Sequence, residues 1–354
     1  LIIDGDAGTA MSRFDGDVAH ASHLRYDVTN LPYFVRSTGR AAIFGVGGGR
    51  DVLSAWTFGF RDISGVELNP IFVDLLTHRQ PFADFAGLAR LPGVRFYVDE
   101  ARSWATRARG GFNVIQMSMI DTWAATGAGA FSLSENGLYT VRAWTTFFER
   151  LDPHGVFSVS RWYAPGGVDE AGRMVSLGTA ALLATGSSDP RRHLFVAACG
   201  RVATLLVFRS PMLAEEIATL RRACIEYGYT VVLSPDEESA SHVLASIVTA
   251  GSLPMLRQRT QHLALDLTPP TDDRPFFFNV LPFTRPWAAV REFGGFAGVL
   301  RGNILATLTL LVILTVSVLL VTMTIVVPLR PAIRQVGRPL AVGGTAYFAL
   351  LGLG

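Results

Sequence analysis

The feature that most limits how this 354-residue chain can fold is an alternation of short apolar runs with helical segments between Ala41 and Trp162. The runs are almost continuously apolar, as in strands that are covered on both faces. The segments between them place apolar residues at helical spacing. This alternation predicts an α/β fold with a Rossmann-like, doubly wound, mostly parallel sheet. The five predicted strands lie in AAIFGVGGG, DISGVELNP, VRFYVDEAR, FNVIQMSMID and GVFSVSRW.

The pattern continues more loosely up to Thr249. Two further apolar runs, HLFVAA and VATLLVFRS, are joined at Gly200-Arg201, and so short a connection requires them to be antiparallel. Helices are predicted at about 170–184 and 211–227, followed by a short strand in TVVLS. At the other end of the chain, 1–5 reads as a strand that enters an Asp-Gly turn. We predict a β-hairpin and lead-in over 1–40 and a nucleoside-binding domain over 41–250.

The C-terminal part has a different composition. Residues 304–327 are 24 residues without a charge. At 1.5 Å per residue they span about 36 Å, which is enough to cross a bilayer core with some tilt. We predict a juxtamembrane segment over 251–303, a transmembrane helix over 304–327 and the start of a second one over 340–354. Because the chain begins with Leu1 and stops inside this apolar run, we expect it to be part of a longer protein.

Composition makes several classes of function less probable. The formal net charge is only +2 and no long basic run occurs, so we expect no nucleic-acid partner. Cys199 and Cys224 lack C-x-x-C spacing, which favours neither a disulfide scaffold nor a zinc site. The seven histidines show no ligand spacing either, so no metal is predicted.

A glycine loop follows the first predicted strand. Gly45, Gly47 and Gly49 would let the chain turn sharply and let a ligand approach the backbone without a Cβ in the way. Glu67 ends the second strand, 18 residues after Gly49, where a carboxylate can accept hydrogen bonds from both ribose hydroxyls. Arg50 takes the place of the third glycine of G-x-G-x-x-G, which makes a nicotinamide dinucleotide the less favoured ligand.

Acidic residues also end the third strand. Asp99 or Glu100 could accept a hydrogen bond from an adenine amino group. In an open α/β sheet ligands bind beyond the carboxyl ends of the strands, so the loop and these carboxylates should converge on one ligand. The pattern therefore predicts a site for an adenosine-type nucleoside.

These motifs resemble the spermidine synthase (polyamine aminopropyltransferase) family and its relatives with the methyltransferase fold. The similar stretches are IFGVGGGRD, GVELNP, YVDEAR and LYTVRAWTTFFERLDPHGVFSV, and the resemblance covers roughly residues 1–209. With the apolar C-terminal segment and PTDDRPFFF, the chain looks most like bacterial membrane-bound spermidine synthase-like proteins. The resemblance implies S-adenosylmethionine or its decarboxylated form as the cofactor, with ribose at Glu67 and adenine at Asp99 or Glu100.

The chain departs from that family at the end of the fourth strand. The family has two aspartates there; here Ser118 replaces the first and Asp121 remains. A serine hydroxyl is not a general base at neutral pH without an activating partner. Asp121 is therefore the candidate catalytic residue, and Ser118 is kept as a candidate cofactor contact. With one carboxylate in this loop and Gly8 in place of the family's N-terminal glutamine, plain polyamine synthesis is in doubt.

Two hypotheses follow. The first is a membrane-anchored transferase that moves an alkyl group, methyl or aminopropyl, to a small-molecule acceptor such as an amine. The second is a nucleoside-binding sensor or regulatory domain that catalyses little. Arginines flank the apolar helix equally on both sides, so charge does not set its orientation. Because such nucleosides are cytoplasmic, we expect the α/β domain on the cytoplasmic side of a bacterial inner membrane; a homo-oligomer stays open.

Overall fold

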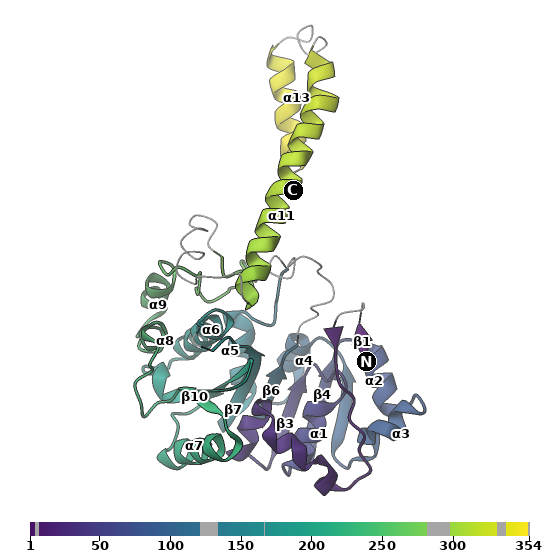
Figure 1. Cartoon of the computed structure of the whole chain (residues 1–354), viewed down its shortest axis with the longest axis vertical. Helices are drawn as coiled ribbons and strands as arrows, with labels where there is room; N and C mark the ends of the chain where they lie inside the picture. The colour runs from purple at the N-terminus through teal and green to yellow at the C-terminus, as the bar shows by residue number, and fades with distance from the viewer. Residues whose placement is uncertain (4–6, 121–133, 166, 282–297, 331–337, 353–354) are drawn as a thin grey trace. The chain divides into compact units, whose positions relative to one another are not determined.

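The computed structural model describes residues 1–3, 7–120, 134–165, 167–281, 298–330 and 338–352. Contacts divide the chain into two units, Leu1–Asn303 and Ile304–Gly354. The first unit is an α/β body built on one large sheet (Figure 1). The predicted subdivision of this unit into a lead-in, a nucleoside-binding domain and a juxtamembrane segment stays a prediction.

The main sheet has eight strands in the order β10-β8-β9-β7-β6-β3-β4-β5. β3 to β7 run parallel, whereas β9 is antiparallel to both of its neighbours and β10 is antiparallel to β8. The predicted fold class, including the antiparallel pair at the end, is therefore confirmed. The strands are β3 (Arg40–Phe44), β4 (Asp62–Glu67), β5 (Val94–Val98), β6 (Phe112–Ser118), β7 (Leu151–Trp162), β8 (Leu194–Cys199), β9 (Val202–Phe208) and β10 (Thr230–Leu233).

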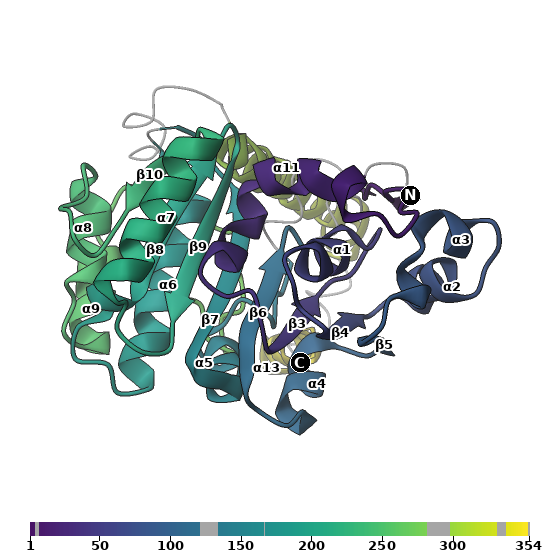
Figure 2. The same ribbon diagram turned by 90° about the horizontal axis from the view of Figure 1, so that it is seen from below.

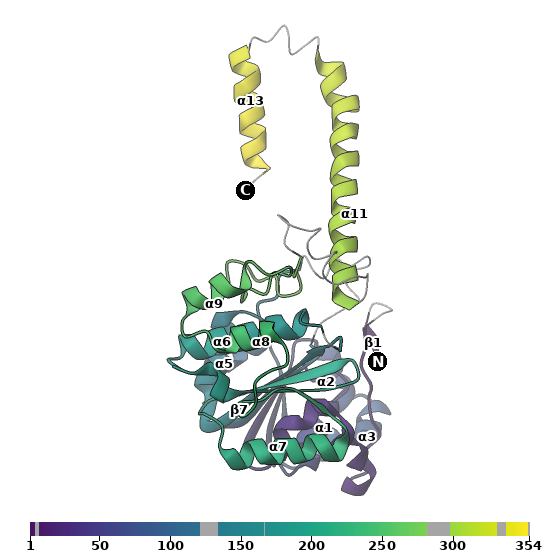
Figure 3. The ribbon, with the colours of Figure 1, turned by 60° about the vertical axis from the view of Figure 1, so that its left-hand side comes forward.

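Helices cover both faces of the sheet. Figures 2 and 3 show α1 and α7 on one face and α5 and α6 on the other. This arrangement explains the continuous apolar runs, because the four residues from Ala41 to Phe44 are completely buried. The helices of this unit are α1 (Arg50–Thr57), α2 (Pro70–Thr77), α3 (Phe82–Ala86), η3 (Leu88–Arg90), α4 (Ala101–Arg107), α5 (Val141–Arg150), α6 (Glu170–Ala184), η6 (Pro190–His193), α7 (Ala214–Tyr227), α8 (His242–Val248) and α9 (Leu253–Thr260).

The N-terminal segment forms local structure of its own. β1 (Ile2–Ile3) pairs antiparallel with β2 (Ala7–Gly8), as the predicted hairpin requires. Two 3-10 helices follow, η1 (Val18–Tyr26) and η2 (Val28–Phe34). Aspartates cap both: the side chains of Asp17 and Asp27 accept hydrogen bonds from backbone N–H groups of the first turns. η2 thereby delivers an almost entirely buried face to the core.

The second unit contains the apolar segment. α11 (Gly298–Val321) continues through a π-helical turn, η7 (Thr322–Val326), and α13 (Arg338–Leu351) follows. Within the described residues one helix, Thr309–Arg330, is long and apolar enough to cross a membrane, with a mean hydropathy of 2.9 and no buried residue in its most apolar part. The predicted second apolar segment, 340–354, falls largely in α13.

Candidate functional site

The glycine loop connects β3 to α1 by a sharp turn. Gly45, Gly47 and Gly49 have φ values of 75°, 51° and 88°, in the left-handed region that favours glycine. The loop is also tightly enclosed. A Cβ on Gly45 would lie 1.9 Å from Cγ2 of Ile120, and one on Gly48 would lie 2.0 Å from the carbonyl oxygen of Ala10. Glycine is therefore required here on grounds of both conformation and space.

The N–H groups of these four glycines all have partners within the protein. They donate from Gly45 to the Val66 carbonyl, from Gly47 to Glu67 Oε2, from Gly48 to Thr9 Oγ1 and from Gly49 to the Val46 carbonyl, each at 2.9 Å. A dinucleotide loop instead points free N–H groups at a pyrophosphate. This loop has no such donors to spare at its glycines, which agrees with the broken dinucleotide motif.

Glu67 holds the loop from the neighbouring strand. Its Oε2 accepts the Gly47 N–H and its Oε1 accepts the N–H of Asn69, both at 2.9 Å. Glu67 is only 9% exposed. A carboxylate has about four acceptor positions, so each oxygen keeps one for a further donor. Glu67 can thus fix the loop and still accept a pair of hydroxyl groups.

Apolar side chains are exposed beside this carboxylate. Leu68 is 69% exposed, and Ile71, at the start of α2, is 55% exposed. Val98, which pairs with Glu67 in the register of β4 and β5, is 53% exposed. Large exposed apolar side chains next to polar groups at a strand end are typical of a ligand-binding surface. A flat base lying against them would be covered on its apolar face.

The two acidic residues after β5 have different environments. Glu100 caps α4, since its carboxylate oxygens accept the N–H groups of Arg102 at 2.8 Å and Ser103 at 2.7 Å. Asp99 forms an ion pair with Arg107, and its Oδ1 accepts the Glu100 N–H at 2.9 Å. Sequence reasoning left the adenine contact open between them, and the structure engages only Asp99 with an arginine.

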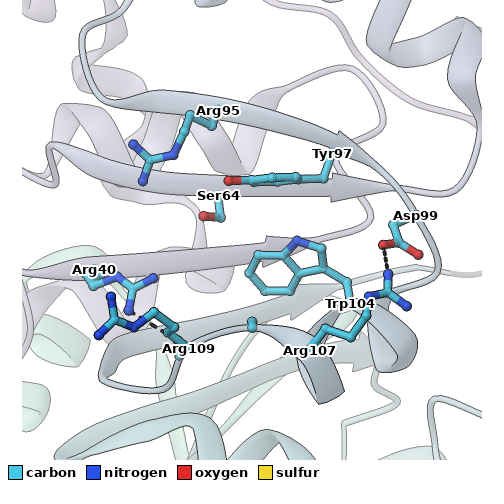
Figure 4. Close-up of a pocket in the computed structure, with 9 residues that line it drawn as sticks. Arg40, Ser64, Arg95, Tyr97, Asp99, Trp104, Arg107 and Arg109 are labelled. Carbon is cyan, nitrogen blue, oxygen red and sulfur yellow. Dashed lines mark hydrogen bonds and ion pairs between the residues drawn. The ribbon is translucent and has the colours of Figure 1, made fainter.

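Asp99 also belongs to a separate pocket of about 420 Å³ (Figure 4). Side chains alternate between the faces of a strand, so Ser64 points to the face opposite Glu67. Tyr97 and Asp99 share that opposite face with Ser64. Asp99 thus lines a pocket on the face opposite Glu67, and the adenine contact stays open between Asp99 and Glu100. The pocket is lined by Arg40, Ser64, Arg95, Tyr97, Asp99, Trp104, Arg107, Ala108 and Arg109.

Ser118 ends β6, next to β3, and is 7% exposed. Its Oγ accepts a hydrogen bond from Gln116 Nε2 at 2.9 Å. An amide is not a base, so this contact does not activate the hydroxyl as a nucleophile or proton acceptor. The next residue, Met119, has a φ of 53°, a strained value for a non-glycine residue that marks the end of the strand. Asp121, the candidate catalytic residue, lies outside the described residues.

Three residues at this edge of the sheet were not anticipated from the sequence: Thr9, Leu68 and Gln116. Gln116 interrupts an apolar strand, which is a signal that could have been read as a buried polar group needing partners. The contact of Thr9 with the loop depends on the path of the N-terminal hairpin, and nothing in the sequence reveals it. Among the described residues no group of three or more His, Cys, Asp or Glu side chains is placed to hold a metal ion.

No protein-family model matches the chain, and no curated protein matches it. Solved structures with a similar fold include a spermidine synthase in complex with the transition-state analogue AdoDATO, at 10% identity over 70% of this chain and 76% of that one, with a TM-score of 0.40. A probable spermidine synthase from Corynebacterium glutamicum ATCC 13032 gives 16% identity over 65% and 78%, with a TM-score of 0.42.

Human methyltransferase-like protein 13 in complex with SAH is a third similar structure, at 13% identity over 58% of this chain and 91% of that one, with a TM-score of 0.40. Identities and TM-scores this low do not establish a shared family. The function is therefore proposed from the geometry of the strand ends.

Proposed function

We propose that the first unit binds an S-adenosyl nucleoside, S-adenosylmethionine or its decarboxylated form, at the carboxyl ends of β5, β4, β3 and β6. The observation that carries this proposal is the position of Glu67. Its carboxylate holds a glycine loop whose glycine N–H groups are all engaged, and it retains an acceptor position on each oxygen. A ribose diol fits such a carboxylate, whereas a pyrophosphate does not fit such a loop.

The order of the strands arranges the ligand along the edge. Glu100 and the exposed Leu68 would meet the adenine, and Glu67 would accept from the ribose hydroxyls. The 5′ substituent would then cross the glycine loop of β3 toward Ser118 on β6, because β3 lies between β4 and β6. Adjacent strands are about 4.8 Å apart, so this path from β4 to β6 is roughly 10 Å long.

The first candidate activity is alkyl transfer. When bound, such a nucleoside supplies a carbon that is activated by a neighbouring cationic sulfur. The protein's part would be to fix that carbon over the loop and to align a small-molecule acceptor for in-line displacement, a contribution that is mostly positional. Asp121, which lies outside the described residues, stays the candidate for contact with the acceptor. Methyl and aminopropyl transfer share this arrangement.

The second candidate is a nucleoside sensor or regulatory domain that catalyses little. The contact of Ser118 favours it: the hydroxyl at the end of β6 accepts from an amide and has no base beside it among the described residues. Binding with no turnover in the presence of an amine acceptor would distinguish this function from the first.

We further propose that the helix Thr309–Arg330 anchors the chain in a bacterial inner membrane, with the first unit on the cytoplasmic side. Its 22 residues extend about 33 Å at 1.5 Å per residue, close to the thickness of a bilayer core. The cytoplasmic placement rests on the location of the proposed nucleoside. Extraction with alkaline carbonate tests the anchor, because a spanning helix stays in the pellet.

Calorimetry on the full chain in detergent micelles tests the nucleoside site. We expect S-adenosylmethionine or its decarboxylated form to bind, and methylthioadenosine to compete for the same site. Glu67→Gln should weaken binding of all three about ten- to a hundredfold, because it removes charge-assisted hydrogen bonds to the diol. Glu149→Gln, on the exposed surface of α5, is the matched control and should bind as the unmodified chain does. Equal affinity of the Glu67→Gln chain would remove the site assignment.

A further inference from the structure

A chain of buried hydrogen bonds runs from the N-terminal lead-in to the candidate site. Tyr33 Oη, in η2, donates to Gln116 Oε1. Gln116 Nε2 then donates to the Thr29 carbonyl at 3.0 Å and to Ser118 Oγ at 2.9 Å. Tyr33, Gln116 and Thr29 are at most 2% exposed, and Ser118 is 7% exposed. This series of hydrogen bonds is thus closed to solvent except at Ser118.

The Thr29 carbonyl fixes the direction of the hydrogen bonds that Gln116 makes in this series. A backbone carbonyl can only accept, so the atom of Gln116 that faces the Thr29 carbonyl must be the amide nitrogen. The amide oxygen is then on the other side, where it accepts from Tyr33. The second hydrogen of the same nitrogen points to Ser118 Oγ. Rotating the amide by half a turn would place two acceptors against each other at Thr29.

Tyr33 reinforces this direction. Burial raises the pKa of its phenol well above the usual value, and the charge of Asp51 raises it further. The phenol therefore stays protonated across the physiological range and remains a donor to Gln116. Replacing Tyr33 or Ser118 would remove one hydrogen bond of the series but would leave the orientation of the Gln116 amide set by the Thr29 carbonyl.

The consequence falls on Ser118. A serine hydroxyl has one hydrogen to donate, and its oxygen already accepts from Gln116. The structure gives Ser118 Oγ no second partner among the residues described. Its hydrogen is therefore available to an acceptor that is not supplied by those residues. Ser118 lies beside the glycine loop, since Phe44 and Met117 are partners in the register of β3 and β6.

We propose that Ser118 is a donor that recognises a carboxylate oxygen on the 5′ arm of the nucleoside. The protein would thereby select S-adenosylmethionine over its decarboxylated form. The inference rests on the proposed nucleoside site and adds the identity of the arm. A carboxylate accepts the Ser118 hydrogen in a charge-assisted bond. An arm that ends only in an ammonium group offers no acceptor and leaves that hydrogen unpaired at a nearly buried position.

The test compares three ligands on the full chain in detergent micelles. Calorimetry with S-adenosylmethionine, decarboxylated S-adenosylmethionine and methylthioadenosine gives a ratio of dissociation constants for the carboxylated and decarboxylated arms. We expect the unmodified chain to prefer the carboxylated arm about ten- to a hundredfold, the range for one charge-assisted hydrogen bond. Ser118→Ala should reduce this preference to about threefold or less and leave the affinity for methylthioadenosine, which has neither group, unchanged.

Two further variants secure the interpretation. Ser160→Ala is the matched control: Ser160 is the register partner of Ser118 on β7, and its buried Oγ lies 2.8 Å from Thr204 Oγ1, away from the chain of bonds. It should keep the full preference. Gln116→Glu introduces a side chain of nearly the same shape that burial keeps protonated. Its one hydrogen goes to the Thr29 carbonyl and the same oxygen accepts from Ser118, so this variant should turn the Ser118 hydrogen inward and reduce the preference to about threefold or less, as Ser118→Ala does.

The outcomes separate this inference from the one on which it rests. If no ligand binds the unmodified chain, the nucleoside site itself is wrong. If the nucleosides bind but Ser118→Ala keeps the full preference for the carboxylated arm, the site stands and the role of Ser118 is refuted. A preference for the decarboxylated arm in the unmodified chain would refute it as well.

Discussion

Removing the Glu67 carboxylate should loosen the glycine loop even when no ligand is present. The side chain accepts two backbone N–H groups at 2.9 Å, from Gly47 and Asn69, and it is 9% exposed, so little water can replace it. Hydrogen bonds to a charged group contribute about 1.5–3 kcal/mol each, and two bonds to one carboxylate are not fully additive. Glu67→Ala should therefore lower the free energy of unfolding by about 2–4 kcal/mol.

Glu67→Gln separates the two bonds. The amide keeps one acceptor oxygen and loses the charge, so we expect about half of the loss, roughly 1–2 kcal/mol. Urea unfolding of the purified chain, followed by tryptophan fluorescence and extrapolated linearly to water, measures both values. Glu149→Ala is the control, because an exposed side chain on α5 should change the free energy of unfolding by about 0.5 kcal/mol or less.

Ligand binding supplies an independent measurement on the same variants. Methylthioadenosine at 100 times its dissociation constant should add about 2.7 kcal/mol to the unfolding free energy of the unmodified chain. The same concentration should add much less to the Glu67→Ala chain. If Glu67→Ala unfolds within about 0.5 kcal/mol of the unmodified chain, the carboxylate does not hold the loop, and the geometry from which the site is inferred is wrong.

Three further outcomes are expected. Gly48→Ala should abolish nucleoside binding in calorimetry, because its Cβ would lie 2.0 Å from the Ala10 carbonyl oxygen and would displace the glycine loop. Unchanged binding would contradict the close packing of Ala10 on the loop. Burial raises the pKa of Asp169 in the folded chain above its usual value. The protonated side chain therefore stabilises the fold fully at a pH below its unfolded pKa, and this stabilisation is lost as pH rises through its folded pKa. Asp169→Asn should therefore raise the urea midpoint at pH 7 but not at pH 3, and an equal gain at both would refute this. If the first unit is cytoplasmic, a membrane-impermeant maleimide should label the exposed Cys199 only after the cells are lysed. Burial raises the pKa of the Cys224 thiol to about 11, so Cys224 should stay unlabelled until the protein unfolds.

Much of the fold was predictable from local pattern. Apolar runs such as that of β3, alternating with helical segments, are typical of strands covered on both faces, and helices between such strands give parallel crossovers. The two-residue connection at Gly200-Arg201 fixed the antiparallel pair of β8 and β9. In each case the information lies within one segment or between consecutive segments, where spacing and sterics suffice.

The candidate site was predictable only in part. Placing Gly45, Gly47, Gly49 and Glu67 at one edge of the sheet follows from the rule that parallel strands share their carboxyl ends. Which face a side chain takes beyond the end of a strand does not follow from that rule. Asp99 and Glu100 are neighbours in sequence, yet one pairs with Arg107 and the other caps α4.

The sequence by itself determined the strands of the main sheet, several of the helices between them, the glycine turn and the apolar C-terminal helix, because each depends on the composition and period of a contiguous stretch. It did not indicate η1, η2, α8 or α9. The tertiary structure alone decided what the polar groups do. It brought Thr9 to the loop from 39 residues away and Tyr33 to Gln116 from 83 residues away. Hydrogen bonds across such separations depend on the packing of the whole body, since a buried donor or acceptor must be met by whichever group the fold brings to it.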